Sequence, residues 1–288
     1  MMKLIVKNFA TKTDQGWAME TLMDVQWAHA LAPGATILLV QAKSNSITDL
    51  LVAIDYANKN GATVVSMSWG SNEFASEALY EAKFTKPNCV YIASSGDTGG
   101  VVCWPSCSTK VMAIGGTVLS VTSTGLRTNS SAEVGWSGSG GGISLYQPLP
   151  LFQSSRGLKG KRQTPDVGII ADPGAAVYNS FGFSSQKGWF AVGGTSLGAV
   201  CWAPIIAIAN QLRVSAKKKT LSTSSLLTYL YNTLGNGPSY SKNFYDIIAG
   251  TAGNNTTKAG YDNVAGLGAP KNTNMVSGII ADLVNTIP

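Results

Sequence analysis

Residues 89–100 read CVYIASSGDTGG, an apolar run that ends in a glycine-rich loop with one acidic residue, Asp97. A short run rich in β-branched and aromatic residues and bounded by glycine is typical of a strand buried on both faces of a parallel sheet. Three further runs have this character, at 36–41, 63–67 and 111–114. The sequence therefore predicts a parallel sheet with Asp97 at the carboxyl end of one strand.

Helical patterns alternate with these runs. Apolar residues recur at helical spacing, and further helices are expected after the sheet; the segments are 17–31, 47–60, 74–83, 196–212, 222–234 and 273–284. Strands that alternate with helices indicate an α/β fold. The Ser/Gly/Thr-rich stretch from Gly116 to about Leu145 predicts exposed loops and hairpins, and one more strand is expected at 190–192. No linker divides the chain, so we expect a single domain over 1–288.

The composition excludes several classes of protein. The chain has 288 residues, of which 44% are hydrophobic and 12% charged, so it can bury enough apolar surface to order itself. Polar residues interrupt each apolar stretch before the roughly 20 residues of a membrane span. Much of the positive charge lies in two clusters, at 159–162 and 217–219, which lack the interleaved aromatics of nucleic-acid sites. We expect neither nucleic acid nor a membrane as a partner.

Cysteine usage and sequons bear on location. The four cysteines have no Cys-x-x-Cys spacing, which argues against a zinc site. Cys103 and Cys107 can pair if the loop between them folds back, and the sequons at Asn129, Asn254 and Asn255 suit a secreted chain. The first residues contain no apolar signal core. The expected location is extracellular or an acidic compartment.

Gly194-Thr195-Ser196-Leu197-Gly198 follows the expected strand 190–192 and opens the next helix. A serine at a helix N-terminus, flanked by glycines, stands where a nucleophile is often found, since the helix dipole favours negative charge there. A capping serine fits the same pattern. The residues that could activate Ser196 must decide between these interpretations.

The single histidine does not suit the role of base. An α/β-hydrolase has its histidine after the nucleophile, whereas His29 lies far upstream of Ser196. A subtilisin-type order of Asp14, His29 and Ser196 is formally possible. However, His29 falls at the end of a helix, just before Leu31-Ala32-Pro33, where a capping or packing role is more typical.

A pair of carboxylates is the alternative base. Glu20 and Asp24 stand at i and i+4 on the 17–31 helix, so both side chains project from one face. Two like charges this close cannot both ionise readily, so one proton is shared and one pKa rises. Such a pair can take the Ser196 proton, with Glu20 as base and Asp24 polarising it. A solvated acidic helix face is the other interpretation.

Asp97 is the third candidate for chemistry. It follows a buried strand directly, where α/β folds gather their sites. An aspartic acid in an apolar, glycine-lined loop can stay protonated and donate a hydrogen bond to an oxyanion. An ordinary Asx turn is the alternative.

Taken together, these residues belong to a longer pattern that resembles the sedolisins, in particular their kumamolisin-like members. These serine-carboxyl peptidases share the subtilisin fold but have Glu in place of the His base. The matching motifs follow the family's order: Glu20-x-x-x-Asp24, Ala32-Pro33-Gly34-Ala35, Ser66-Met67-Ser68-Trp69-Gly70, Ser95-Gly96-Asp97, Gly115-Gly116-Thr117, Gly140-Gly141-Gly142, Pro165-Asp166-Val167, Ala171-Asp172-Pro173 and Gly193-Gly194-Thr195-Ser196.

The resemblance implies a subtilisin-like three-layer fold with a mostly parallel central sheet flanked by helices. It also implies hydrolysis of peptide bonds through an acyl-enzyme. By this resemblance Ser196 is the nucleophile, Glu20 the base, Asp24 its partner and Asp97 the oxyanion residue.

The resemblance extends to substrate binding. Trp69 looks like the tryptophan that supports the family's carboxylates. The backbone from Ser68 to Gly70 is expected to line the cleft and to bind peptide substrate in β-strand fashion.

A calcium site is also implied. Family members bind one Ca²⁺ through an Asp-Ile pair and a later Gly-x-Gly-x-Asp segment, which match Asp246, Ile247, Lys258, Gly260 and Asp262 here. Carboxylates and backbone carbonyls form the hard oxygen cage that suits Ca²⁺. Lys258 replaces the first glycine, which is compatible with a ligand that contributes only its carbonyl.

Three departures accompany the resemblance. Only Met1 to Met19 precede Glu20, so we expect this chain to lack the family's usual N-terminal strands and its propeptide. An open sheet edge left in this way could favour self-association. Val200 stands in place of the usual proline, and the isoelectric point near 9.1 is unlike that of strongly acid-adapted members.

Three functions remain open at this level. The first is an acid-active endopeptidase, since Asp97 must keep its proton to donate and the acidic pair must share one. The second is a tripeptidyl aminopeptidase of the same family. The third is a non-catalytic binding or scaffold protein on a degenerate sedolisin fold.

Overall fold

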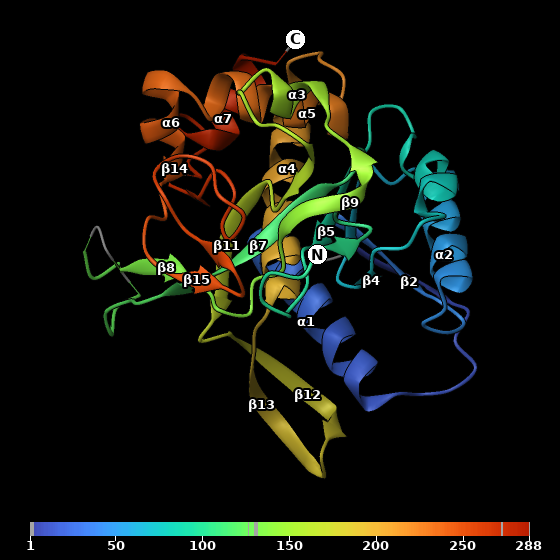
Figure 1. The fold of residues 1–288 in the computed structure, drawn as a ribbon. Helices are drawn as coiled ribbons and strands as arrows, with labels where there is room; N and C mark the ends of the chain where they lie inside the picture. Colours follow the sequence, from blue (N-terminus) through green and yellow to red (C-terminus); the bar gives the residue numbers. More distant parts are fainter. Residues whose placement is uncertain (1–2, 126, 130–131, 272, 288) are drawn as a thin grey trace.

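The central sheet consists of four parallel strands with one antiparallel strand at its side (Figure 1). The computed structural model describes residues 3–125, 127–129, 132–271 and 273–287. The parallel strands lie in the order β11-β7-β5-β3, and β8 pairs antiparallel with β7. Their bounds are β3 Val64–Met67, β5 Val90–Ser94, β7 Met112–Leu119, β8 Glu133–Gly135 and β11 Val167–Asp172. The predicted mostly parallel sheet is confirmed.

Helices cover both faces of this sheet. Val90 and Ile92 of β5 pack in one core with α4 (Thr195–Ser215), α5 (Thr223–Tyr229) and α7 (Ile279–Asn285). The alternate residues of β5, Tyr91 and Ala93, pack in a second core with α2 (Ile47–Lys59) and the 3₁₀-helix η1 (Glu77–Phe84). Successive residues of a strand point to opposite faces. The fold therefore has the three layers that were expected.

The sequence predicted most of these elements and missed the first one. The strand β2 (Thr36–Gln41) has the predicted bounds, and α1 (Gln15–Leu31) begins two residues earlier than expected. The unpredicted β1 (Lys3–Asn8) pairs in parallel with β2, and the two form a separate two-stranded sheet. Its flanking lysines and exposed apolar residues give it no alternation of polar and apolar side chains.

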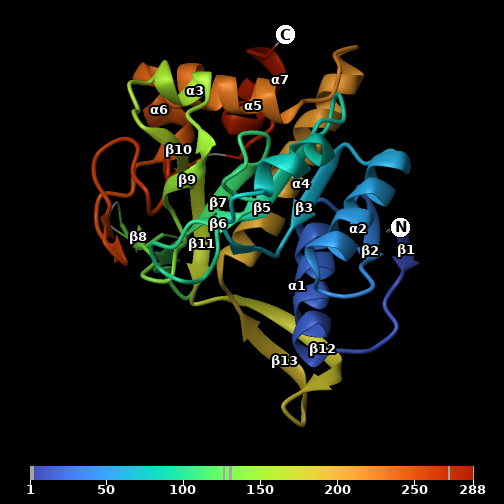
Figure 2. The same ribbon diagram turned by 45° about the vertical axis from the view of Figure 1, so that its right-hand side comes forward.

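The remaining elements are short, apart from one long hairpin. They are α3 Leu151–Ser154, η2 Leu230–Leu234, α6 Gly237–Asn243, β4 Ser71–Asn72, β6 Cys103–Trp104, β9 Gly142–Pro148, β10 Lys161–Thr164, β12 Ala175–Phe183, β13 Gln186–Val192, β14 Phe244–Tyr245, β15 Thr251–Ala252, β16 Asn255–Thr256 and β17 Ala269–Pro270. The hairpin of β12 and β13 extends from the body beside α1 (Figures 1 and 2).

One predicted segment differs in character from the expectation. The stretch 116–145 was expected to form exposed loops, yet Ser139 is fully buried within it. Its hydroxyl donates to the carbonyl of Val264 at 2.7 Å and accepts from the amide of Gly116 at 3.0 Å. A small hydroxyl side chain can satisfy the backbone inside the fold, so Ser-rich composition did not mean exposure here.

The helix α4 is long and apolar enough, by length and composition, to cross a membrane. Two thirds of its apolar window (67%) is nevertheless buried inside the fold, against the sheet and α7. Such burial is what a central core helix of an α/β domain shows.

Candidate active site

The two acidic residues of helix α1 lie on a face of the helix that adjoins its buried face. Asp14 caps its N-terminus by accepting from the amide of Trp17 at 2.9 Å. Met19 and Met23 are buried against α4 and the hairpin. Glu20 and Asp24 each follow one of these methionines by one residue. The helix packing thus holds both carboxyls half-buried between α1 and the sheet.

Ser68 connects this pair to the central sheet. It directly follows β3, is 8% exposed, and its hydroxyl donates to Oδ1 of Asp24 at 2.8 Å. Burial raises the pKa of Glu20 to about 7, and the nearby charge of Asp97 adds to the rise. Burial, and then the charge of Glu20, also raise the pKa of Asp24 well above its usual range. The two carboxyls therefore share protons as a coupled pair.

Ser196 stands in the first turn of α4, half-buried, and interacts with Glu20. The Ser196 side chain lowers the pKa of Glu20 and so opposes part of the rise that burial causes. Within the part of the chain that the structure describes, Oε1 of Glu20 is buried and has no hydrogen-bond partner. The residue before the helix must be glycine. Gly194 has φ of 93°, and a Cβ there would overlap Oδ2 of Asp97. The predicted nucleophile and the predicted base are thus brought together.

Asp97 lies across the start of α4 from this pair. Its Oδ1 accepts from the backbone amide of Thr195 at 2.8 Å and from the Thr195 hydroxyl at 2.7 Å. The same hydroxyl accepts from the amide of Gly96 at 3.1 Å, which fixes the loop that carries Asp97. Asp97 itself is exposed, so the expectation of an apolar enclosure was wrong. The loop lies at the surface, where the parallel strands end.

Thr195 and the contact of Ser68 with Asp24 were not foreseen from the sequence. Thr195 is 1% exposed and joins the loop of Asp97 to the helix of Ser196. Its position immediately before the candidate nucleophile was the available signal. Ser68 had been predicted only as part of the substrate cleft.

Trp69 and Gly70 lie in the segment predicted to bind substrate. The ring of Trp69 is half-buried and stacks at a tilt on Trp104, with centroids 6.1 Å apart. Gly70 is exposed, and a Cβ there would meet the carbonyl of Trp104 at 3.0 Å. The segment then pairs with β6 through β4. The backbone at Gly70 is therefore exposed and lies beside the carbonyl of Trp104.

The two predicted metal-binding segments lie side by side. The carboxylate of Asp246 accepts from the amide of Gly260, at 3.0 Å for Oδ2. Asp262 is buried, and its Oδ1 accepts from the amides of Val264 and Ala265, each at 2.8 Å. Burial raises the pKa of Asp262 to about 6, and the charge of Asp246 contributes to the rise. The side chain of Lys258 is exposed.

The carboxylates of Asp246 and Asp262 repel one another. Carboxylate oxygens are the ligand type that Ca²⁺ takes. A cation between Asp246 and Asp262 would relieve their repulsion.

The structure also bears on the predicted roles of the cysteines and of the single histidine. All four cysteines are free, so Cys103 and Cys107 form no disulfide. Cys107 is fully buried and its thiol donates to Glu77 at 3.5 Å. His29 lies in the last turn of α1, and its buried Nδ1 has no hydrogen-bond partner among the described residues. A base whose inner nitrogen lacks an orienting partner does not match a catalytic histidine.

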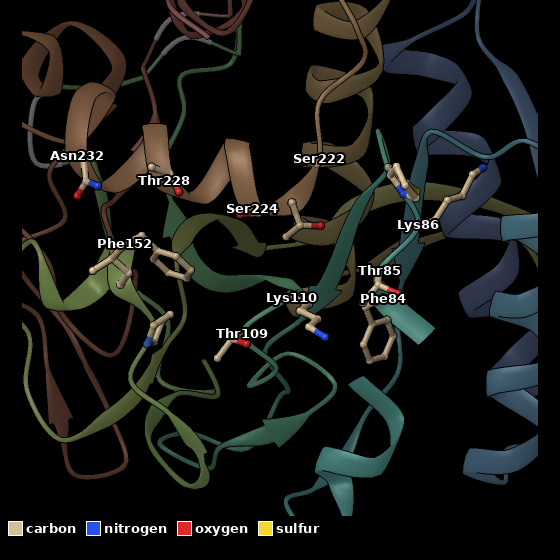
Figure 3. Close-up of a pocket in the computed structure, with 15 residues that line it drawn as sticks. Phe84, Thr85, Lys86, Thr109, Lys110, Phe152, Ser222, Ser224, Thr228 and Asn232 are labelled. Carbon is tan, nitrogen blue, oxygen red and sulfur yellow. The ribbon is translucent and has the colours of Figure 1, made fainter. Parts of the chain in front are cut away.

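A cavity of about 530 Å³ lies elsewhere in the molecule (Figure 3). Its lining includes Cys89 and Lys110, which precede β5 and β7, together with Phe152 and Ser224. It therefore opens at the amino ends of the strands. Ser68 and Asp97 follow the carboxyl ends of β3 and β5, so this cavity is separate from the candidate active site.

Comparison with known proteins identifies the family of the chain. The sequence profile of the subtilase family matches residues 12–268. Sedolisin of Pseudomonas sp. (strain 101) is 29% identical over 192 residues, which are 57% of this chain and 30% of that protein. The chain thus spans under a third of this curated relative's length.

Solved structures show the same fold. Pseudomonas sedolisin, a serine-carboxyl proteinase complexed with two molecules of pseudo-iodotyrostatin, superposes with a TM-score of 0.76 at 24% identity, over 93% of this chain and 82% of that one. The prenylagaramide maturation protease PagA superposes with a TM-score of 0.56 at 18% identity, over 100% of this chain and 87% of that one.

Proposed function

The chain belongs to the subtilase family, and from this premise we propose that it is a serine peptidase that hydrolyses peptide bonds through an acyl-enzyme on Ser196. The observation that carries the proposal is the interaction of Ser196 with Glu20, a carboxyl whose pKa is raised to about 7. A general base is most effective when its pKa lies near the working pH. Glu20 meets that requirement and an ordinary surface glutamate does not.

In the proposed acylation step, Glu20 accepts the proton of the Ser196 hydroxyl as its oxygen attacks the scissile carbonyl. Asp24 retains a proton shared with Glu20 and so limits the charge that builds on the pair. Ser68 fixes Asp24 through its 2.8 Å hydrogen bond. Glu20 then returns the proton to the leaving amine, and water repeats the sequence to release the acyl group.

Asp97 is proposed to stabilise the oxyanion of the tetrahedral intermediate. Oδ1 is held by Thr195, which leaves Oδ2 to carry a proton and donate it as a hydrogen bond. A donor fixed before reaction begins costs no reorganisation when the charge develops. Because the Glu20–Asp24 pair must keep a proton, we place the activity on the acid side of about pH 7.

Extended peptides are the proposed substrates. The backbone beside Gly70 is open and supported by Trp104, so a peptide can pair with it as an additional strand. An endopeptidase follows if both ends of this cleft are open, and a tripeptidyl peptidase if one end is closed by a group that holds an amino terminus. Endopeptidase action is the proposal here.

A calcium ion is proposed as a structural cofactor. The carboxylates of Asp246 and Asp262 and the carbonyls of Ile247, Lys258 and Gly260 would hold it. When bound, Ca²⁺ supplies charge neutralisation that fixes the loop between β16 and β17, and it takes no part in the proton transfers.

The test is cleavage of a broad peptide library between about pH 3 and pH 8, a range that spans the carboxyl and imidazole pKa values. The unaltered chain is compared with its Ser196→Ala and Glu20→Gln variants. Acid-side cleavage that both variants lose supports the proposal. Cleavage that survives in either variant would overturn it, and the product lengths separate endopeptidase from tripeptidyl activity.

A further inference from the structure

The hairpin of β12 and β13 is hydrogen-bonded to α1, the helix that carries the acidic pair. The side-chain amide of Gln26 donates to the carbonyl of Tyr178 at 2.8 Å, and the side-chain oxygen of Gln26 accepts from the amide of Tyr178 at 3.0 Å. In an antiparallel sheet, two opposite residues exchange the same pair of hydrogen bonds. Gln26 therefore bonds the backbone of β12 as a residue of a neighbouring strand would.

Other side chains of α1 continue this contact in both directions. Nε1 of Trp27 donates to the carbonyl of Ala176 at 3.1 Å. At the first residue of the helix, Oε1 of Gln15 accepts from the amide of Ser184 at 3.3 Å. The strand β12 thus runs antiparallel along α1, and Figures 1 and 2 both show the hairpin beside this helix. The acidic pair lies between the two ends of the contact.

The second strand of the hairpin leads directly to the proposed nucleophile. The strand β13 pairs with β12 and ends at Val192. Three residues, 193–195, separate that end from Ser196. The amide of Gly194 donates to the carbonyl of Ala171 at 2.8 Å, which brings together the two ends of the hairpin. The hairpin is therefore a direct connection between the helix of the proposed base and the start of α4.

We propose that Gln26, supported by Trp27, is a positioning residue that fixes α1 against the hairpin and so holds Glu20 in place beside Ser196. The inference rests on the proposed peptidase reaction, and it gives Gln26 no contact with substrate. Precise placement matters because a displacement of about 1 Å can lower a rate about a hundredfold.

The titration of Glu20 would report such a displacement. The side chains that act on the pKa of Glu20 are those of Ser196, Asp97 and Ser68, which all lie outside the hairpin. Burial is the largest cause of the raised pKa. A helix that moves away from the hairpin admits water, so the pKa should fall toward its ordinary value. A change at Gln26 that only weakened folding would leave this titration unaltered.

Steady-state kinetics of two variants test the proposal. Gln26→Met and Trp27→Phe remove the hydrogen bonds to β12 and keep side chains of similar shape. Trp17→Phe is the control for the indole, because Trp17 lies on the same helix, is 41% exposed and donates no side-chain hydrogen bond to β12 within the described residues. Gln211→Met is the control at an exposed glutamine of α4.

The substrate is the peptide of the library that the unaltered chain cleaves fastest. Values of kcat and KM are measured between about pH 3 and pH 8, a range that spans the carboxyl and imidazole pKa values. The temperature is one at which circular dichroism shows every variant to be folded.

The proposal predicts that both variants lower kcat at unchanged KM, by about tenfold or more for Gln26→Met, as expected when a reacting group is displaced. Their pH profiles should move to lower pH by about half a unit or more, and both controls should match the unaltered chain. An unchanged kcat, a change in KM alone, an unmoved pH profile or an equal loss in the controls would contradict the proposal. An unaltered chain that cleaves no peptide would instead refute the proposed function, and this inference with it.

Discussion

The hydroxyl of Ser68 donates to the carboxylate of Asp24 across 2.8 Å, and this single contact joins the end of a sheet strand to the acidic pair on α1. It orients the partner of the proposed base from a residue that is itself buried. Ser68 also lowers the pKa of Glu20, so it acts on both carboxyls of the pair. The proton-transfer path of the proposed mechanism begins from this arrangement.

Folding stability should decrease as pH rises through the range in which Glu20 titrates. The pKa of Glu20 is about 7 in the folded state, whereas it is near 4.5 in the unfolded chain. The stabilisation is therefore complete below about pH 4.5 and is lost as pH approaches 7. Chemical denaturation at a series of pH values measures this slope.

Glu20→Gln and Asp24→Asn should each flatten that slope, because a neutral amide takes no part in the titration. Asp55→Asn is the control for loss of one acidic side chain, since Asp55 pairs with Lys83 at the surface. An unchanged slope in both site variants would show that the pair does not hold its proton as described.

Substitutions at Asp97 should separate a hydrogen-bond donor from a merely structural carboxylate. Asp97→Ala should lower kcat by about 10²–10³-fold, the usual cost of one oxyanion donor. Asp97→Asn keeps a hydrogen-bond donor at this position, so it should retain more activity than Asp97→Ala. Steady-state pH profiles of the three proteins give the comparison, and equal losses in both variants would exclude the donor role.

Calcium should raise the thermal stability of the chain. Binding to the folded state alone adds about 2.7 kcal/mol at a hundredfold excess over Kd, which corresponds to a rise in Tm of roughly 5–10 °C. Differential scanning calorimetry with Ca²⁺ and with a chelator measures it. Asp246→Asn and Asp262→Asn should abolish the shift, and Asp49→Asn, on α2, should keep it. A shift of equal size in all four proteins would place the ion elsewhere.

His29 should be dispensable for catalysis. Its Nδ1 is buried in the last turn of α1 and finds no hydrogen-bond partner in the part of the chain that the structure describes. His29→Gln should therefore leave kcat/KM within about threefold of the unaltered chain, since changes away from the reacting groups have small effects. A loss of kcat/KM above a hundredfold, in a variant whose fold is intact by circular dichroism, would instead support His29 as a subtilisin-type base.

The sequence was sufficient for the elements whose patterns are local. The strand at 36–41 and the helices α1 and α2 follow from apolar periodicity and from caps such as Asp14. The strand β1 could not be predicted in this way, because exposed Leu4, Ile5 and Val6 show no alternation and depend on pairing with β2.

In the candidate site, too, local patterns could be predicted from the sequence and tertiary contacts could not. Spacing alone placed Glu20 and Asp24 on one helix face, and local sequence singled out Ser196 and Asp97. The resemblance then assigned the roles of all four residues. The contacts of Ser68 and Thr195 required the structure, since they join residues that are 44 and 98 positions apart in the chain. Tertiary hydrogen bonds of this kind leave no periodic signal in a sequence.

Covalent labelling of Ser196 tests the central claim most directly. The chain is treated with a peptidyl aldehyde or phosphonate and the labelled residue is located by peptide mass mapping, alongside Glu20→Gln. The account predicts a single adduct on Ser196, with the labelling rate reduced by about 10⁴-fold or more without the Glu20 carboxylate, as for residues that act as a unit. Folded protein that acquires no adduct, or that is labelled equally fast without Glu20, would contradict it.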